Sequence, residues 1–290
     1  MTEILFPNIA VLGAGTMGHG IAQVCAASGR ATFLYDVTPE LAQRGFDSIV
    51  KTLEKAIELK KATPAERDGI LANVRTTADL EEAVREANLV IEAIPERLDL
   101  KKDVFRRVAA ITRDDTVLAT NTSSLSITEI GHAVTHSARF IGLHFFNPVP
   151  RMKLLEIVQG DHTSADTLER ARAFAESIGK TPIIVKDSPG FASSRLGIIL
   201  GLESIRMVQS GVASAADIDT AMKLGYGHPM GPLELTDLVG LDVRLAIAEY
   251  LHRTIGEQFR PPDLMRKMVS EGKLGRKTGE GFYKYNGGAK

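Results

Sequence analysis

A glycine-rich turn near the amino terminus constrains the fold of this chain more than any other segment. The turn, Gly13-Ala-Gly-Thr-Met-Gly18, follows the apolar run Ile9–Leu12 and opens a stretch, 16–28, with a helical pattern. In such a strand–turn–helix unit, the first glycine permits a tight turn and the second lets the backbone approach a pyrophosphate. The third lets helix and strand pack closely, and the helix presents its free N–H groups to an anion. The turn therefore predicts a dinucleotide site.

Asp36 completes this pattern, because it ends the next predicted strand, 18 residues after Gly18. A carboxylate at that position accepts hydrogen bonds from a ribose diol and repels a 2′-phosphate, so it favours NAD over NADP. A glycine turn that binds nothing is the alternative, and the matching context weighs against it. The residues expected to contact NAD here are Gly13, Gly15, Thr16, Met17, Gly18 and Asp36.

Apolar strands and helical segments alternate over the first two thirds of the chain. Strands are expected at 9–12, 31–35, 89–94, 116–119, 139–143, 154–159 and 182–186, and helices between most of them at 98–111, 126–132 and 164–178. This alternation predicts an α/β fold over residues 1–187, a Rossmann-type doubly wound sheet with parallel order at least in its first half. The region from about 41 to 74 is too long for one crossover helix, so we expect an inserted helical pair that stands off the sheet. A capping box at Thr63–Glu66 opens its second helix.

Beyond residue 187 the pattern is helical nearly to the end, which predicts an all-helical domain over residues 188–290. The segment 196–208 is apolar almost all round. Such a helix must be buried on every side, either in a domain core or in a subunit interface. We therefore expect a homodimer that forms through the helical C-terminal domain.

Charge and composition exclude several classes of partner. Lys and Arg number 35 and Asp and Glu 36, a net charge of −1, so no strong field exists to attract nucleic acid or an anionic membrane. No apolar run reaches the length of about 18 residues that indicates a membrane span, and the first ten residues lack a signal-peptide layout, so a cytoplasmic location is expected. The single cysteine, Cys25, excludes an intrachain disulfide and a cysteine-based zinc site, and the histidines form no metal-ligand pattern. No metal is expected.

Three polar side chains lie where open α/β sheets bind ligands. Ser123 and His144 each follow a predicted strand, and Glu156 lies within the next strand, 12 residues past His144. Hydride transfer coupled to proton transfer needs an imidazole to take the alcohol proton, a carboxylate to orient the imidazole, and a hydroxyl to hydrogen-bond the substrate oxygen. A histidine with a purely structural role is the alternative, although a buried carboxylate such as Glu156 needs a partner.

Seven sequence motifs occur in order along nearly the whole chain. They are 13–18, Asn121–Leu125, Leu143–Pro150, Asp187–Phe191, Asp217–Gly225, His228–Pro232 and Lys277–Tyr285. Together they resemble the 3-hydroxyacyl-CoA dehydrogenase family, and the short bacterial 3-hydroxybutyryl-CoA dehydrogenases look most similar. The resemblance implies an NAD-dependent oxidoreductase that reversibly oxidises the (S)-3-hydroxyl of a short acyl-CoA to the 3-ketone.

The resemblance also implies roles for individual residues. It makes His144 the general base, Glu156 the carboxylate that polarises it, and Ser123 the residue that bonds the substrate oxygen. It places around the dinucleotide the side chains of Glu96, Lys101, Asn147 and Lys277.

One position departs from the family pattern. Where the family usually has Asn in its Pro-Gly-Phe-x-x-Asn-Arg run, this chain has Ser194. A serine can still donate one hydrogen bond to the substrate oxygen, but it has a shorter reach and no amide. We therefore keep Ser194 among the candidate catalytic residues.

The CoA moiety requires local positive charge, because it carries a 3′-phosphate and a pyrophosphate and the protein is nearly neutral. Lys51 and Lys55, one turn apart on the inserted helix, are the candidate contacts. A solvated helix face with paired charges is the alternative for these two lysines.

Two other functions stay open at this point. The chain could oxidise free 3-hydroxy acids or sugar acids on the same scaffold, as the related L-gulonate dehydrogenases do; Lys51 and Lys55 favour the CoA ester instead. It could also be a non-catalytic NAD-binding or structural protein, because a fold does not determine a function. The spacing of His144 and Glu156 argues against that second alternative.

Overall fold

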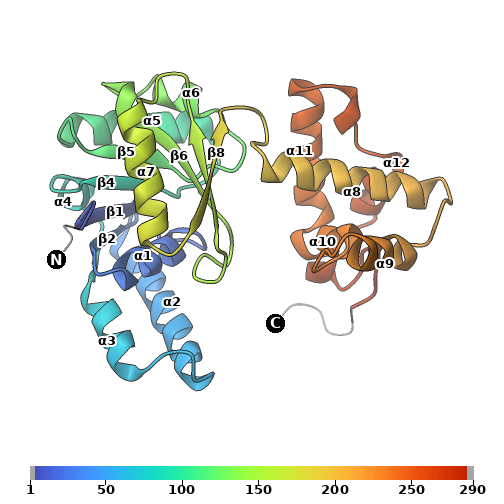
Figure 1. Cartoon of the computed structure of the whole chain (residues 1–290), viewed down its shortest axis with the longest axis horizontal. Helices are drawn as coiled ribbons and strands as arrows, with labels where there is room; N and C mark the ends of the chain where they lie inside the picture. The colour runs from blue at the N-terminus through green and yellow to red at the C-terminus, as the bar shows by residue number, and fades with distance from the viewer. Residues whose placement is uncertain (1–3, 286–290) are drawn as a thin grey trace. The chain divides into compact units, whose positions relative to one another are not determined.

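The computed structural model describes residues 4–285, and the chain divides into two compact units, Met1–Ser188 and Pro189–Lys290. The first unit contains a parallel-dominated sheet with flanking helices, and the second is helical (Figure 1). The predicted fold class is therefore confirmed. The units separate one residue beyond the boundary expected from the sequence.

Within residues 4–188 the strands form one eight-stranded sheet, in the order β3-β2-β1-β4-β5-β6-β7-β8. They are β1 (Asn8–Leu12), β2 (Ala31–Tyr35), β3 (Val74–Thr77), β4 (Leu89–Glu92), β5 (Val117–Thr120), β6 (Phe140–Phe145), β7 (Leu154–Gln159) and β8 (Thr181–Lys186). Neighbouring strands are parallel except β6 and β7, which are antiparallel. The strand order reverses between β1 and β4, and sheets of this kind bind ligands beside the carboxyl ends of the strands at such a reversal.

Helices pack around this sheet because its central strands are apolar on both faces. The helices are α1 (Gly18–Ala27), α4 (Leu80–Val84), α5 (Leu98–Ile111), α6 (Ile127–Gly131) and α7 (Ala165–Ser177), with a 3₁₀ turn, η1 (Ser137–Arg139). Every residue of β4, β5 and β6 is buried, including Glu92 and His144. Buried polar side chains need hydrogen-bond partners, so Glu92 and His144 indicate that the sheet also carries functional groups and does not serve as a hydrophobic core alone.

The inserted helical pair consists of α2 (Pro39–Glu58) and α3 (Pro64–Ala72), which project beyond the sheet in Figure 1. The predicted capping box is confirmed: Thr63 Oγ1 accepts a hydrogen bond from Glu66 N at 3.2 Å, and the Glu66 carboxylate accepts one from Thr63 N at 2.7 Å. The insertion is followed by two elements that the sequence did not predict, the edge strand β3 and the short helix α4.

The second unit contains five α-helices within residues 189–285. They are α8 (Ser193–Gln209), α9 (Ala215–Gly225), α10 (Pro232–Val239), α11 (Leu241–Thr254) and α12 (Asp263–Ser270), with two 3₁₀ turns, η2 (Glu257–Phe259) and η3 (Arg276–Thr278). Their core includes Ile198, Leu202 and Leu251. Within the chain, α8 is not buried all round as expected, because Leu196 is 64% exposed and Leu200 36%. Packing in the core of the second unit therefore buries the apolar side chains on only one side of α8.

Three further features bear on the classes of function considered above. No helix in the range 4–285 is both long enough and apolar enough to cross a membrane. Among these same residues, no group of three or more His, Cys, Asp or Glu side chains could hold a metal ion. Burial raises the pKa of the Cys25 thiol to about 12, so this thiol stays protonated at neutral pH.

Candidate active site

The glycine-rich turn joins β1 to α1 with a geometry that requires its glycines. Gly13 has a φ of +98°, and a Cβ there would lie 2.7 Å from the carbonyl oxygen of Ala93. A Cβ on Gly18 would lie 1.6 Å from the carbonyl oxygen of Gly13, so α1 approaches the turn this closely only without a side chain. A Cβ on Gly15 would meet no heavy atom of another part of the described chain within 4 Å, so the backbone there is open to a ligand.

Asp36 lies beside this turn, just after β2. Its carboxylate accepts hydrogen bonds from the backbone N–H groups of Ala14, at 2.8 Å, and Val37, at 2.7 Å. A cavity of about 660 Å³ extends from the turn past Asp36 to Arg107 of α5. This volume is within the range of small-molecule binding sites. Arg107 lies in its wall although the sequence analysis did not select it.

The cavity fits the dinucleotide expected from the sequence. The open backbone at Gly15 and the start of α1 suit a pyrophosphate, and the fixed carboxylate of Asp36 suits a ribose diol. The predicted residues Gly13, Gly15, Thr16, Met17 and Asp36 all line this cavity, and Gly18 packs beneath the turn. Their individual contacts with NAD stay predictions.

His144 and Glu156 face each other across the antiparallel ladder of β6 and β7. The register pairs the two residues directly, and Nδ1 of His144 lies 2.7 Å from Oε2 of Glu156. Glu156 is fully buried and His144 is 7% exposed. A carboxylate at Nδ1 orients the ring and favours the tautomer in which Nε2 accepts a proton.

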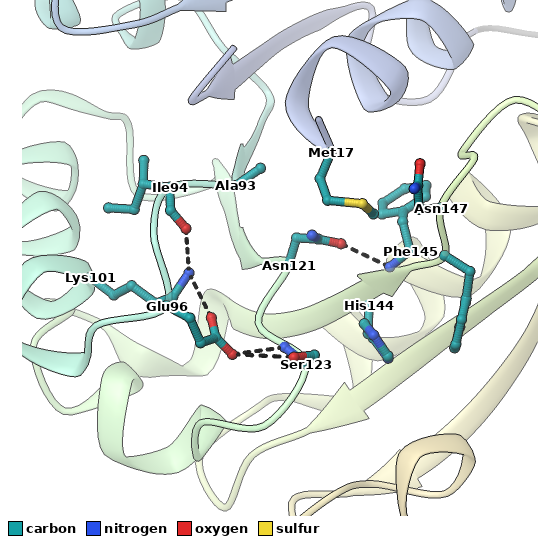
Figure 2. A pocket seen from close by; sticks show the side chains of 11 residues that line it. Met17, Ala93, Ile94, Glu96, Lys101, Asn121, Ser123, His144, Phe145 and Asn147 are labelled. Atoms are coloured by element: carbon teal, nitrogen blue, oxygen red, sulfur yellow. Dashed lines mark hydrogen bonds and ion pairs between the residues drawn. The ribbon is translucent and has the colours of Figure 1, made fainter. Parts of the chain in front are cut away.

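A second cavity, of about 360 Å³, lies at the carboxyl ends of β4, β5 and β6 (Figure 2). Six residues selected from the sequence line it: Met17, Glu96, Lys101, Ser123, His144 and Asn147. Met17, Ala93 and Ile94 line both this cavity and the first one, so the two adjoin. A small molecule in the second cavity would therefore meet the imidazole on one side and the occupant of the first cavity on the other.

The side chains of Glu92, Lys101 and Glu96, which we call the Lys101 cluster, lie beside the second cavity: Glu92 and Lys101 are buried, whereas Glu96, which lines the cavity together with Lys101, is partly exposed. Lys101 is 1% exposed, and its Nζ donates to Glu92 Oε1 at 2.6 Å and to the carbonyl oxygen of Ile94 at 3.2 Å. Nζ also lies 3.3 Å from Glu96 Oε2 (Figure 2). Burial raises the pKa of Glu92 despite the opposing influence of Lys101.

Glu96 connects the Lys101 cluster to the loop after β5. Its Oε1 accepts hydrogen bonds from Thr122 Oγ1 at 2.5 Å and from Ser123 N at 3.0 Å. Burial acts to raise the pKa of Glu96, but Lys101 and these hydrogen bonds outweigh it and hold the pKa below its usual value. Glu96 thus stays ionised at the edge of the cavity and fixes the backbone of Ser123.

Lys180 holds the turn between β6 and β7, which carries Asn147. Nζ of Lys180 donates to the carbonyl oxygens of Val149, at 2.5 Å, and Met152, at 2.7 Å. The side chain is buried, and this burial lowers the pKa of Lys180. Two carbonyl bonds from one ammonium group hold the turn beside the end of β6.

Lys51 and Lys55, the candidate CoA contacts, lie on the exposed surface of α2. Lys55 pairs with Glu58 at 2.7 Å, with both side chains about 63–64% exposed. This is the kind of solvated pair that the sequence analysis considered as the alternative. Their role in CoA binding stays a prediction.

Ser194 and Lys277 belong to the second unit. Ser194 lies in the first turn of α8, and Nζ of Lys277 donates to both carboxylate oxygens of Asp242, at 2.5 and 2.7 Å. Their proposed contacts with substrate and dinucleotide likewise stay predictions.

Sequence reasoning missed three residues that organise this site. Glu92 ends an otherwise apolar strand, which is the same signal that selected Glu156. Asn121, whose Oδ1 accepts from Phe145 N at 2.8 Å and ties β5 to β6, was quoted only as part of a motif. Lys180 gave no signal, because a lysine before a strand resembles any surface cation.

Comparisons with known proteins agree with this geometry. The family model for the NAD-binding domain of 3-hydroxyacyl-CoA dehydrogenase matches residues 8–188, and the model for the C-terminal domain matches residues 190–285. The mitochondrial hydroxyacyl-coenzyme A dehydrogenase of Sus scrofa is 43% identical, over 98% of this chain and 92% of its own. A probable 3-hydroxybutyryl-CoA dehydrogenase of Deinococcus radiodurans is 46% identical, over 95% of this chain and 99% of its own.

A solved structure leads to the same result. The crystal structure of (S)-3-hydroxybutyryl-CoA dehydrogenase from Ralstonia eutropha has a TM-score of 0.93 and 39% identity, covering 97% of this chain and 100% of that one. Together with the two family models, this confirms the resemblance noted in the motifs. The chain belongs to the 3-hydroxyacyl-CoA dehydrogenase family, and its amino-terminal unit is the NAD-binding domain of that family.

Proposed function

We propose that this NAD-dependent oxidoreductase reversibly oxidises the (S)-3-hydroxyl of short-chain 3-hydroxyacyl-CoA, with 3-hydroxybutyryl-CoA as the preferred substrate. The observation that carries the proposal is the His144–Glu156 pair, 2.7 Å apart and directly opposed, in the wall of a cavity that adjoins the dinucleotide cavity. An alcohol in that cavity would meet a proton acceptor and a hydride acceptor at once.

Proton transfer is the task of His144. In the oxidative direction NAD, when bound, supplies the acceptor for the hydride that leaves C3 of the substrate. Nε2 of His144 takes the hydroxyl proton, and Glu156 at Nδ1 stabilises the positive charge that the ring then carries. A buried cation without this carboxylate would be strongly destabilised. In the reductive direction the charged ring returns the proton to the carbonyl oxygen.

Ser123 is the proposed donor to the substrate oxygen. Glu96 fixes its backbone N–H at 3.0 Å, whereas its hydroxyl lies 3.5 Å from Glu96 Oε1. A contact that long is weak, so the hydroxyl can exchange it for the oxygen at C3. Ser123 lines the same cavity as His144 (Figure 2), and Ser194 of α8 is a further candidate for this oxygen.

A substrate panel tests the proposal. We expect acetoacetyl-CoA with NADH, and 3-hydroxybutyryl-CoA with NAD, to be turned over with kcat/KM about 10²-fold or more above that for free 3-hydroxybutyrate or gulonate, because the CoA moiety contributes binding energy remote from C3. NADPH and NADP should be poorer cofactors, because the carboxylate of Asp36 repels a 2′-phosphate. Steady-state kinetics followed through the absorbance of the reduced nicotinamide measure all of these.

Two results of the panel would contradict the proposal. A higher kcat/KM for a free acid than for its CoA ester would favour the alternative substrate class. Binding of NADH without turnover of any substrate would favour a non-catalytic protein.

We further propose that the chain forms a homodimer through its second unit. Several large apolar side chains on its helices are exposed in the single chain, namely Leu196, Leu200, Leu224, Leu238 and Val243. Exposed apolar groups in such number are typical of an interaction surface. Light scattering at micromolar concentration should report twice the chain mass of 31.4 kDa. A particle of one chain mass would contradict the dimer.

A further inference from the structure

We infer that Glu92 is a positioning residue: its buried carboxylate holds Lys101, and through Lys101 it places Glu96 and Ser123 in the wall of the second cavity. The inference rests on the proposed function for the roles of Ser123 and of the dinucleotide cavity. Glu92 itself lies at the end of β4, behind Lys101, and is fully buried.

Both carboxylate oxygens of Glu92 have hydrogen-bond partners. Its Oε1 accepts from Lys101 Nζ at 2.6 Å and from Ile94 N at 2.7 Å, and its Oε2 accepts from Thr120 Oγ1 at 2.7 Å. A buried ion pair is weak evidence for stability, because apolar side chains of similar volume often serve a core as well. A buried carboxyl group with this hydrogen-bond geometry is therefore better explained by what it positions.

Lys101 links Glu92 to the loop that follows β4. Its ammonium group contacts the loop after β4 at two points, the carbonyl oxygen of Ile94 and the carboxylate of Glu96. Ile94 lines both cavities and Glu96 lines the second, so this loop borders both the dinucleotide site and the substrate site. Glu92 binds the same ammonium group from the end of β4. Lys101 therefore anchors the loop to the sheet.

Glu96 extends these contacts to the loop that carries Ser123. Glu96 accepts from Thr122 and from the backbone of Ser123, which is the proposed donor to the substrate oxygen. Glu92, Lys101 and Glu96 thus form a continuous series of contacts from the interior of the sheet to Ser123. A shift of the ammonium group would be transmitted to both cavities.

Glu92→Gln isolates the charge of Glu92 from its shape. The amide oxygen can accept hydrogen bonds from Lys101 and from Ile94 N, and the amide nitrogen can donate one to Thr120 Oγ1. Each contact of Glu92 can therefore still be made by a polar atom. Glu96 is then the one carboxylate of the Lys101 cluster that still attracts the ammonium group, which should shift toward the cavity. We expect the dissociation constant of NADH to rise about 3–10-fold and kcat/KM for acetoacetyl-CoA to fall about 10–100-fold. The melting temperature should stay close to that of the parent chain.

The experiment is a double-mutant cycle of Glu92→Gln and Lys101→Met. NADH binding is measured by NADH fluorescence in a chain that has no tryptophan, together with steady-state kinetics and thermal melting. If Glu92 acts through Lys101, then Glu92→Gln has no further effect on NADH binding or kcat/KM in the Lys101→Met background. In that background it should raise the melting temperature, because it removes a buried carboxylate that has lost its cation.

A matched control comes from the next residue of the same helix. Lys102 pairs with Glu129 at 2.9 Å on the surface. Glu129→Gln and Lys102→Met make the same chemical changes, and they should leave NADH binding and kcat/KM within about twofold.

Two outcomes would overturn the inference. One is that Glu92→Gln leaves NADH binding and turnover at parental values; the other is that it changes them by the same factor with and without Lys101. If Glu92→Gln does not fold, Glu92→Asp replaces it in the same cycle, with smaller shifts in the same direction expected. A parent chain that binds NADH but turns over no acyl-CoA would refute the proposed function, and the NADH arm of the cycle would still decide the role of Glu92.

Discussion

Replacing His144 with glutamine should lower kcat for acetoacetyl-CoA reduction about 10²–10⁴-fold, the contribution of a well-positioned general acid or base. Glutamine is chosen because it is neutral and close to histidine in volume, so it removes the proton acceptor with little change in packing. The loss corresponds to about 3–5 kcal/mol of transition-state stabilisation. NADH binding should change by less than about twofold, because the first cavity is lined by other residues.

His132→Gln is the control for this experiment. His132 lies on the surface after α6, and the same substitution there should leave kcat unchanged. Turnover by His144→Gln at the parental rate, measured from NADH absorbance with saturating substrate, would remove His144 from the mechanism.

Replacing Glu156 with glutamine should lower kcat about 10²-fold while leaving the fold intact. The amide oxygen can still accept the Nδ1–H bond of His144, now 2.7 Å from the carboxylate, so the ring keeps its orientation. What is lost is the negative charge that stabilises the protonated ring, and a neutral partner compensates a buried cation far less well.

The double variant of His144→Gln with Glu156→Gln separates this explanation from a structural one. If Glu156 affects turnover through the imidazole, the double variant should be no slower than His144→Gln alone. Multiplicative losses would mean that Glu156 has an independent role. Glu169→Gln, which breaks an exposed pair with Arg172 at 2.9 Å, is the matched control.

Most of the sheet could be predicted because its central strands are short apolar runs between turns and helices. The strand β3 was missed for a physical reason: Val74-Arg-Thr-Thr77 is an edge strand, and two of its four side chains are exposed. The antiparallel pairing of β6 and β7 was also missed, although a signal was present. Only residues 146–153 separate them, and a parallel crossover needs a dozen residues or more.

The site was predicted unevenly for a related reason. His144 was predicted because it directly follows an apolar strand, and Glu156 because it interrupts the next one, whereas the hairpin that pairs them directly was not predicted. The contacts of Glu92 with Lys101 depend on where β4 ends relative to the first turn of α5, which periodicity does not specify. Lys180 binds backbone carbonyl groups, which every residue has, so the pattern of side chains along the sequence cannot predict its contacts.

Because His144 and Glu156 are paired across a β-ladder, an insertion or deletion within β6 or β7 has a different effect from one in the turn between them. One residue inserted into β6 before His144 would turn the imidazole to the opposite face of the sheet, because side chains alternate along a strand. One residue inserted between Pro150 and Lys153 would leave the ladder in register, and its cost would be confined to a longer turn and to the two carbonyl bonds from Lys180. Insertions and deletions that arise in functional descendants of this sequence should therefore collect in the turn, while the two strands keep their length.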